Sequence, residues 1–452
     1  MTSTTTHNDL QVGISNRQIL NIALPITLAM FVPQINFFTN NYFISGLGER
    51  ELGTAGITGV FYLIFALIGT GLNNGLQGLI ARRAGQQNTD AIGQVFGQAA
   101  RISLLYAAAG VIIIFALAPV FLGAVLKSPE VTKEAVGFLK IRVLGLPFLY
   151  MFQLGNAFLV GSNNSRYMKV AFIIQALINI VLDYGLIYGH FGLPAIGFNG
   201  AAIASVIAEI TAFAIVYSLI RHKQLHTRFS LFSHFAFNKE LSSLYFKQSF
   251  PLVMQYLLSI VAWLQFYILI ENTGERPLAI SNVMRNVFSV LGIFVWPFAS
   301  TCNAMVSNII GQDKKDKVQL LIRRIMSLSM LFTFTFSLPI LAFPGFFMGI
   351  FNNDPLFIQE AIPVTRLVAS GTLLMSAGTV WLNAVTGTGN TKVNLAIEII
   401  AITIYSTYIW LVIHVWHWSL SWAWASEILY WLIIFTLSFF YIRSGKWKKK
   451  VI

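Results

Sequence analysis

The chain has little charge and a single cysteine. Only 10% of its 452 residues are charged, against about 25% in an average soluble domain. A soluble protein of this length would need more polar surface, so this composition excludes an ordinary soluble fold. The lone Cys302 excludes a disulfide within these residues and a multi-cysteine metal site. The phosphate-binding motif GxxxxGK[ST] is absent as well, which argues against direct use of ATP.

Apolar residues make up most of what is present. Hydrophobic residues account for 56% of the chain, and the mean hydropathy is +0.70. They form repeated runs of about 20 residues, enough to cross a hydrocarbon core of about 30 Å. The polar N-terminus lacks the short apolar core of a cleavable signal, so we expect the first span to act as the insertion signal and to remain.

These runs predict an all-α membrane protein with twelve transmembrane helices. A basic connection, 221–247, divides them into an N-lobe (1–220, helices 1–6) and a C-lobe (248–452, helices 7–12 and a basic tail). The connection holds three histidines that could suggest a metal site but are expected to face solvent or lipid headgroups: His222, His226 and His234. The expected helices are 18–43, 54–78, 96–126, 136–160, 168–190, 198–220, 247–271, 279–306, 325–350, 361–385, 394–416 and 419–442.

The net charge of +13 is explained by topology rather than by nucleic acid. Most Lys and Arg residues fall on the side of the membrane that carries both termini, which predicts that both termini are cytoplasmic. The opposite loops hold few basic residues: Arg50, Lys127, Lys133 and Arg276.

The two halves are related by an internal repeat. A shift of 226 residues places Pro25 on Pro251 and Gly48 on Gly274, and it places the loop GSNNSR on GTGNTK. Each half has an even number of spans, so both copies enter the membrane in the same orientation. This predicts two six-helix bundles related by a pseudo-two-fold axis along the membrane normal, an architecture in which rocking of the bundles gives alternating access. It favours a transporter.

A carboxylate lies inside the hydrophobic run LINIVLDYGLIYG. Asp183 and Asn179 are four residues apart, so they share one helix face with Cβ atoms about 5–6 Å apart. The pair suits a hard monovalent cation, or a proton held on the acid, because burial favours the neutral form. The alternative is a hydrogen bond that only joins helices.

Four more ionisable residues are expected inside spans, where each costs about 2.5–3.5 kcal/mol. Glu209 could pair with a neighbour or carry a proton. Glu398 and Glu427 could each reach the membrane interface, and Arg285 could pair with one of the acids.

Helix 1 is unusually rich in amides and has a proline in its interior. Pro33 removes a backbone hydrogen bond and should kink the helix, which could serve as a gate. Gln34, Asn36 and Asn40 could bind an ion or a substrate, or bond to other helices.

The C-lobe does not repeat these polar residues. Phe266 stands at the position of Asn40, and Ile409 at that of Asp183. We therefore expect an ion-handling N-lobe and a C-lobe cavity that packs against apolar ligands, although ordinary helix packing would also explain its residues. The candidates for this cavity are Gln255, Trp263, Phe266, Met284, Trp296, Met375 and Trp381.

Several motifs resemble those of the multidrug and toxic compound extrusion (MATE) transporters, nearly from end to end. They are ALPITLAMF with YFISGLGERELGTAGI, then NIVLDYGLIYGHFGLPAIGFNGAAIAS, and the paired loops GSNNSR and GTGNTK. The resemblance implies antiport of small amphipathic, often cationic, organic compounds against H⁺ or Na⁺. It implies a monomer in a bacterial cytoplasmic membrane, with membrane lipid around it and no cofactor besides the coupling ion.

The resemblance also implies an ion site. Prokaryotic members form it from a helix-1 aspartate, a helix-5 Asn and Asp, and polar groups of helices 4 and 6. Asn179 and Asp183 match the helix-5 pair, and Ser205 and Asn156 match the helix-6 and helix-4 groups. Asn40 stands where the family has its helix-1 aspartate, so this site has one carboxylate and should bind Na⁺ more weakly.

Two other functions are compatible with a polytopic chain. A flippase for lipid-linked oligosaccharides would need an arginine-rich cavity, for which only Arg285 offers support. A membrane-embedded enzyme could use His414 and His417, but these histidines fit an interfacial aromatic belt more simply.

Overall fold

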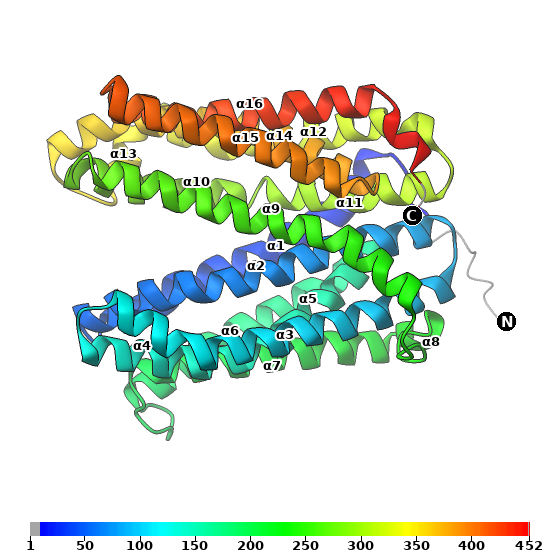
Figure 1. Cartoon of the computed structure of the whole chain (residues 1–452), viewed down its shortest axis with the longest axis horizontal. Helices are drawn as coiled ribbons and strands as arrows, with labels where there is room; N and C mark the ends of the chain where they lie inside the picture. The colour runs from blue at the N-terminus through cyan, green and yellow to red at the C-terminus, as the bar shows by residue number, and fades with distance from the viewer. Residues whose placement is uncertain (1–9, 451) are drawn as a thin grey trace. The chain divides into compact units, whose positions relative to one another are not determined.

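The computed structural model describes residues 10–450 and 452, and within this part of the chain all regular structure is helical (Figure 1). A short π-helical turn, Leu411–Val415, continues α15. The α-helices are α1 (Asn16–Ser45), α2 (Glu49–Gly85), α3 (Thr89–Val125), α4 (Pro129–Arg142), α5 (Leu146–Gly161), α6 (Met168–Tyr188), α7 (Phe198–His222), α8 (Leu225–Arg228), α9 (Lys239–Glu271), α10 (Glu275–Gly292), α11 (Trp296–Gly311), α12 (Val318–Ala342), α13 (Pro344–Gly349), α14 (Pro355–Gly387), α15 (Thr391–Trp410) and α16 (Leu420–Arg443).

The prediction of an all-helical protein with twelve spans is confirmed. Eleven helical segments of the described chain are long and apolar enough to cross a membrane, and the pair α10 and α11, bent by 41°, makes the twelfth. Helices α4 and α5 are joined by a single 3₁₀ turn, Val143–Gly145, and count as one span. Several helices are longer than predicted because their polar ends continue beyond the apolar run, as at Glu49 in α2.

The chain forms two compact units. The N-lobe unit comprises residues 28–253, and the C-lobe unit comprises residues 254–452 together with the described residues up to 27. Each unit holds a bundle of six spans. Helices α1 and α9 each begin in one unit and end in the other, so the division differs from the boundaries 1–220 and 248–452 expected from the sequence.

Helix α9 begins inside the segment that the sequence assigns to the linker. It starts at Lys239, not at 247. The reason is local: Asn238 caps the helix by accepting a hydrogen bond from the Leu241 amide at 3.0 Å. The charge of this first turn made the segment resemble a loop, although charged residues are common at helix ends.

The shortened linker, 223–238, is bonded to α3 within the N-lobe unit. The side chain of Gln98 donates to the Ala236 carbonyl at 2.7 Å and accepts from the Asn238 amide at 3.1 Å. His234 Nε2 lies 2.9 Å from Asp90 Oδ1. His234 therefore faces a carboxylate of its own lobe.

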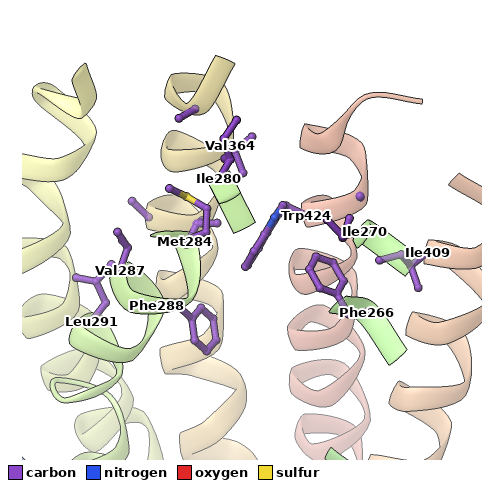
Figure 2. Close-up of a cluster of buried hydrophobic side chains, with 14 of the residues drawn as sticks. Phe266, Ile270, Ile280, Met284, Val287, Phe288, Leu291, Val364, Ile409 and Trp424 are labelled. Carbon is purple, nitrogen blue, oxygen red and sulfur yellow. The ribbon is translucent and has the colours of Figure 1, made fainter. Parts of the chain in front are cut away.

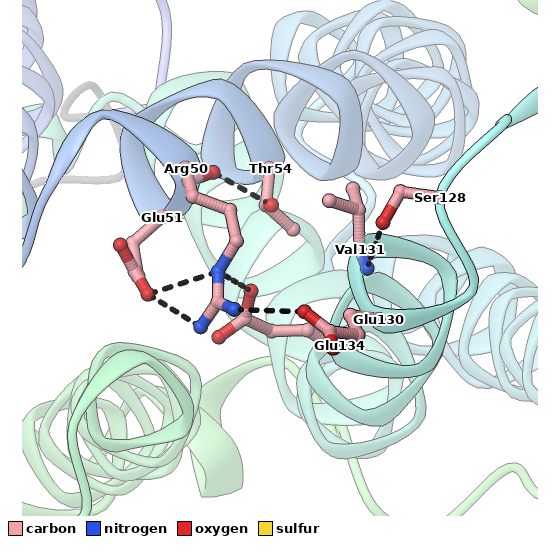
Figure 3. Close-up of polar contacts among 7 residues, drawn as sticks. All are labelled: Arg50, Glu51, Thr54, Ser128, Glu130, Val131 and Glu134. Carbon is pink, nitrogen blue, oxygen red and sulfur yellow. Dashed lines mark hydrogen bonds and ion pairs between the residues drawn. The ribbon is translucent and has the colours of Figure 1, made fainter.

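Equivalent ion pairs occur in the two repeats, on the outer side of the predicted topology. Figure 3 shows Arg50 among acidic side chains of the N-lobe unit, with Glu134 at 3.7 Å. In the C-lobe unit Arg276 lies 3.6 Å from Glu360. Both members of the second pair are 226 residues beyond those of the first, as the repeat requires. Arg50 is 52% exposed, so such a pair contributes at most about 1 kcal/mol.

Candidate functional site

The Asp183 carboxylate is completely buried in the N-lobe unit. It lies on α6 with 0% of its surface exposed. Asn179, one turn earlier, donates from Nδ2 to Asp183 Oδ2 at 3.2 Å. The other oxygen, Oδ1, has no hydrogen-bond partner among the described residues. The predicted pair is thus formed, and it leaves one carboxylate oxygen available to a proton or a cation.

The end of α6 holds the end of α1 beside this pair. Helix α6 stops at Gly189, whose φ of +80° is readily adopted only by glycine. One residue earlier, the Tyr188 hydroxyl donates to the Phe43 carbonyl of α1 at 2.5 Å. The Phe43 ring also lies 5.9 Å from the ring of Tyr184. Asn40, about one turn before Phe43, is thereby placed on the part of α1 that is tied to α6.

The amides of α1 are not bonded to the aspartate. Asn40, Asn36 and Gln34 are half-buried, and the Asn36 Oδ1 atom is buried without a hydrogen bond from any described residue. Helix α1 continues through Pro33 without a break, and Pro33 itself is exposed. A gating role for Pro33 and ion binding by Asn40 remain predictions.

The two residues matched on helices 4 and 6 lie on α5 and α7. Asn156 is buried, and its Oδ1 atom lacks a partner in the described chain. Ser205 is half-buried on α7, the helix packed against α6. Neither side chain forms a described hydrogen bond with Asp183. Asn156 Oδ1, like Asp183 Oδ1, is a buried oxygen of the N-lobe unit that can still accept.

A second buried carboxylate of the N-lobe unit, Glu209, is held in an ion pair. Arg142 at the end of α4 donates to both oxygens of Glu209, at 2.8 and 2.7 Å. The Tyr62 hydroxyl donates to the same carboxylate at 3.1 Å, and the guanidinium lies 3.8 Å from the Tyr62 ring centroid. Of the two roles expected for Glu209, the structure therefore shows pairing.

Arg142 is a residue of this site that the sequence pattern did not single out. A basic residue inside the predicted helix 136–160 was a sufficient signal, because a charge within a span needs a partner. Such a bidentate pair, with an aromatic ring on the guanidinium face, is the geometry that suits buried arginine.

Gly145 gives this pair its space, which leads to a testable expectation. A Cβ at this position would overlap Glu209 Oε2 and lie 3.2 Å from Arg142 Nη1. Gly145→Ala should therefore lower the unfolding free energy by about 1–3 kcal/mol, the usual cost of overpacking. Denaturant unfolding in detergent measures the change. Gly123→Ala, where nothing lies within 4 Å of the added carbon, is the control. Equal stability of the two variants would contradict the packing argument.

The C-lobe unit holds its own buried carboxylate, Glu398 on α15. It is 0% exposed, so the expectation that it reaches the interface is wrong. Gln255 and Ser259 of α9 donate to it at 3.3 and 2.7 Å. Tyr430 of α16 donates at 2.5 Å. The sequence placed Glu398 at a helix end, but α15 begins at Thr391 and α9 and α16 enclose its second turn.

Two other ionisable residues also differ from expectation. Arg285 is exposed and forms no ion pair with a described residue. Its guanidinium lies 5.6 Å from the centroid of the Tyr267 ring. Glu427 is buried rather than interfacial, because it lies on α16, which packs against α14 and α15.

Five of the seven residues assigned to a C-lobe cavity belong to one hydrophobic cluster or pack against it, and Figure 2 labels two of its members, Phe266 and Met284. Within it the Phe266 ring is 5.0 Å from that of Trp424, whose Nε1 donates to Ser281 Oγ at 3.0 Å. The cluster is closely packed, with Met284 and Met375 fully buried. The five are Trp263, Phe266, Met284, Trp296 and Met375.

The remaining two cavity candidates lie elsewhere. Gln255 bonds Glu398, and Trp381 packs against Phe439 with ring centroids 5.0 Å apart. His414 and His417 are exposed near the end of α15. The Trp410 ring lies 6.0 Å from the His414 ring, as is common for residues at a membrane interface.

Comparison with known proteins shows which family this chain resembles. The family model described as MatE matches residues 25–185 and 251–411, two segments whose starts are 226 residues apart, as in the repeat. A probable multidrug resistance protein NorM of Thermotoga maritima is 24% identical over 326 residues, covering 72% of this chain and 69% of the relative. A probable NorM of Synechocystis sp. is 26% identical over 371 residues, covering 79% of each.

Solved structures share the fold. A MOP superfamily transporter from Pyrococcus furiosus matches with a TM-score of 0.90 at 17% identity, covering all of both chains. The outward-facing conformation of a multidrug resistance MATE family transporter matches with the same score, identity and coverage. At this identity the likeness establishes the architecture of two helical bundles and no more.

Proposed function

Because the chain belongs to the MATE family of multidrug efflux transporters, we propose that it is a cation-coupled antiporter. It exports small amphipathic organic compounds, often cationic, by alternating access. It works in the cytoplasmic membrane of a bacterium, with both termini on the cytoplasmic side. The named relatives support the substrate class, since they are described as multidrug resistance proteins.

The observation that carries the proposal is the contrast between the two buried acids of the N-lobe unit. Arg142 neutralises Glu209. Asp183 has no ion-pair partner among the described residues, only the amide of Asn179. An ionised carboxylate in that position is costly, and taking up a proton or a cation removes the cost. Asp183 is therefore suited to bind the coupling ion on one side of the membrane and release it on the other.

We assign the coupling ion to the proton. Sodium would need several oxygen ligands, and Asn40 replaces the second carboxylate that the family supplies on this helix. Asn179 donates a hydrogen bond from its side-chain N–H group to Asp183 Oδ2. That carboxylate oxygen is therefore already engaged and is less available as a ligand for sodium.

The cycle follows from this assignment. Outward-facing Asp183 takes up a proton, which removes its need for water and lets the N-lobe bundle close around it. Substrate leaves outward, the bundles rock, and the proton is released to the cytoplasm. Pro33 in α1 supplies a point at which this closure can bend the helix.

Vesicles containing the purified protein test the function and the ion separately. A permanently charged amphipathic dye is used, since it cannot be trapped by its own protonation. An acidic interior at equal Na⁺ should drive dye uptake well above that of protein-free vesicles. A sodium-loaded interior at equal pH should not. Uptake driven by Na⁺ alone would overturn the proton assignment, and uptake driven by neither gradient would overturn the antiporter.

A further inference from the structure

The C-lobe unit contains a buried acid that the cycle above does not use. Glu398 accepts hydrogen bonds from three neutral side chains, Gln255, Ser259 and Tyr430, that come from two other helices. It is completely buried. None of the described basic residues lies within ion-pair distance of it, so the carboxylate is stabilised by hydrogen bonds alone.

The groups that face Glu398 are all neutral or acidic. Helix α9 supplies Gln255 and Ser259, and α16 supplies Tyr430. Beyond them, the Tyr405 ring of α15 lies 5.8 Å from the Tyr430 ring. Glu427 of α16 acts electrostatically on the same tyrosine. The side chains that bond Glu398 therefore offer hydrogen bonds, and no described basic residue forms an ion pair with it.

The chemistry of the partners separates Glu398 from Glu209. A guanidinium has only donors, so Arg142 could not accept a hydrogen bond from a protonated Glu209. A hydroxyl or a carboxamide can donate or accept. Ser259, Tyr430 and Gln255 can therefore bond the Glu398 carboxylate now and accept a hydrogen bond from it after it is protonated. The network can hold both protonation states without leaving a buried group unpaired.

We propose that Glu398 is a second proton-carrying group, so that each lobe of the transporter carries one titrating carboxylate. Two protons then enter for each substrate exported. The step is a simple proton exchange: an O–H bond forms with a proton from water on the outer side and breaks to water on the inner side. This inference rests on the proposed proton-coupled antiport.

The position of the network gives it a mechanical consequence. Gln255 and Ser259 lie at the start of the part of α9 that belongs to the C-lobe unit, which begins at Met254. Because α9 is one of the two helices that pass from one unit to the other, bonds to Glu398 act on a connecting helix. Protonation removes the charge that strengthens these bonds, and it loosens the hold of α15 on α9.

Infrared difference spectroscopy on the purified protein tests proton binding without any transport. Wild type should show a pH-dependent carbonyl band of a protonated, buried carboxylic acid that is absent from Glu398→Gln. The band should persist in Glu427→Gln and in Asp183→Asn, and Glu398→Asp should restore one. A spectrum of Glu398→Gln that retains every pH-dependent acid band would overturn the proposal. If Glu398→Gln fails to fold, Glu398→Asp still tests the proposal, because its acid band should differ in frequency from that of wild type.

The accumulation ratio of the charged dye then measures the coupling. In vesicles clamped at zero membrane potential, each coupled proton multiplies the final ratio about tenfold per pH unit. Glu398→Gln should therefore reach a ratio about tenfold below wild type at one pH unit. An accumulation ratio of Glu398→Gln equal to that of wild type would show that Glu398 does not carry a second coupled proton. Wild type that shows the infrared band but no acid-driven uptake would refute the antiporter and leave proton binding by Glu398 established.

Discussion

Asp183→Asn is expected to lower the acid-driven accumulation ratio of the dye about tenfold at one pH unit, leaving only the accumulation that the proton on Glu398 supports. The substitution keeps the size and the hydrogen bond to Asn179 but removes the atom that binds the proton. The Asp183 side chain is completely buried in the N-lobe unit. A solvent-exposed acid therefore cannot replace it as the proton-binding group. The variant should still bind the dye and equilibrate it without a gradient, because a permanently neutral residue resembles the protonated state. Uptake rates at several pH values check this.

A matched control shows whether the effect is specific to Asp183 or follows from the loss of any carboxylate. Asp316→Asn makes the same change at an exposed residue and should leave accumulation unchanged. Asp183→Glu retains a titrating group and should retain partial coupling. Accumulation by Asp183→Asn equal to that of wild type would refute the assigned role of the α6 carboxylate.

Arg142→Met is expected to have the largest effect on stability. It leaves the Glu209 carboxylate buried with Tyr62 as its only described hydrogen-bond donor. Removing one partner of a buried ion pair costs about 3–5 kcal/mol, because the remaining charge is uncompensated. Denaturant unfolding of the purified protein in detergent should show a large fall in the midpoint.

Two comparisons test the physical reason. Arg142→Met combined with Glu209→Gln removes the stranded charge and should recover most of the lost stability, since a buried pair is often replaceable by neutral residues. Arg50→Met breaks the ion pairs of an exposed arginine with Glu51, Glu130 and Glu134, and because water screens such pairs it should cost less than Arg142→Met. If the double variant were no more stable than Arg142→Met, the loss would come from packing rather than from charge.

Much of the architecture was readable from the order of residues. The twelve spans, the 226-residue repeat and the Asn179–Asp183 pair depend on local periodicity, which a helix converts directly into a face. The pairing of Arg142 with Glu209 depends on how α4 meets α7, and no local pattern reports which helices are neighbours. The same holds for Glu398, whose three partners come from α9 and α16.

The predicted C-lobe cavity shows the same limit. Trp263, Phe266, Met284 and Met375 were grouped by residue type, and the structure does group them, as packed core. Large apolar side chains fill a cavity or a core equally well, so composition cannot distinguish these environments.

The sequence by itself determined that this protein is a helical membrane protein with two related halves and an acid inside its fifth span, because hydrophobic length and helical spacing are local properties. Only the tertiary structure decided the environment of each buried acid. A guanidinium fixes the charge of Glu209, one amide leaves Asp183 an open oxygen, and hydroxyls and an amide surround Glu398. These differences arise from neighbours distant in the chain, and they decide which buried acid is paired with a cation and which is held by neutral groups.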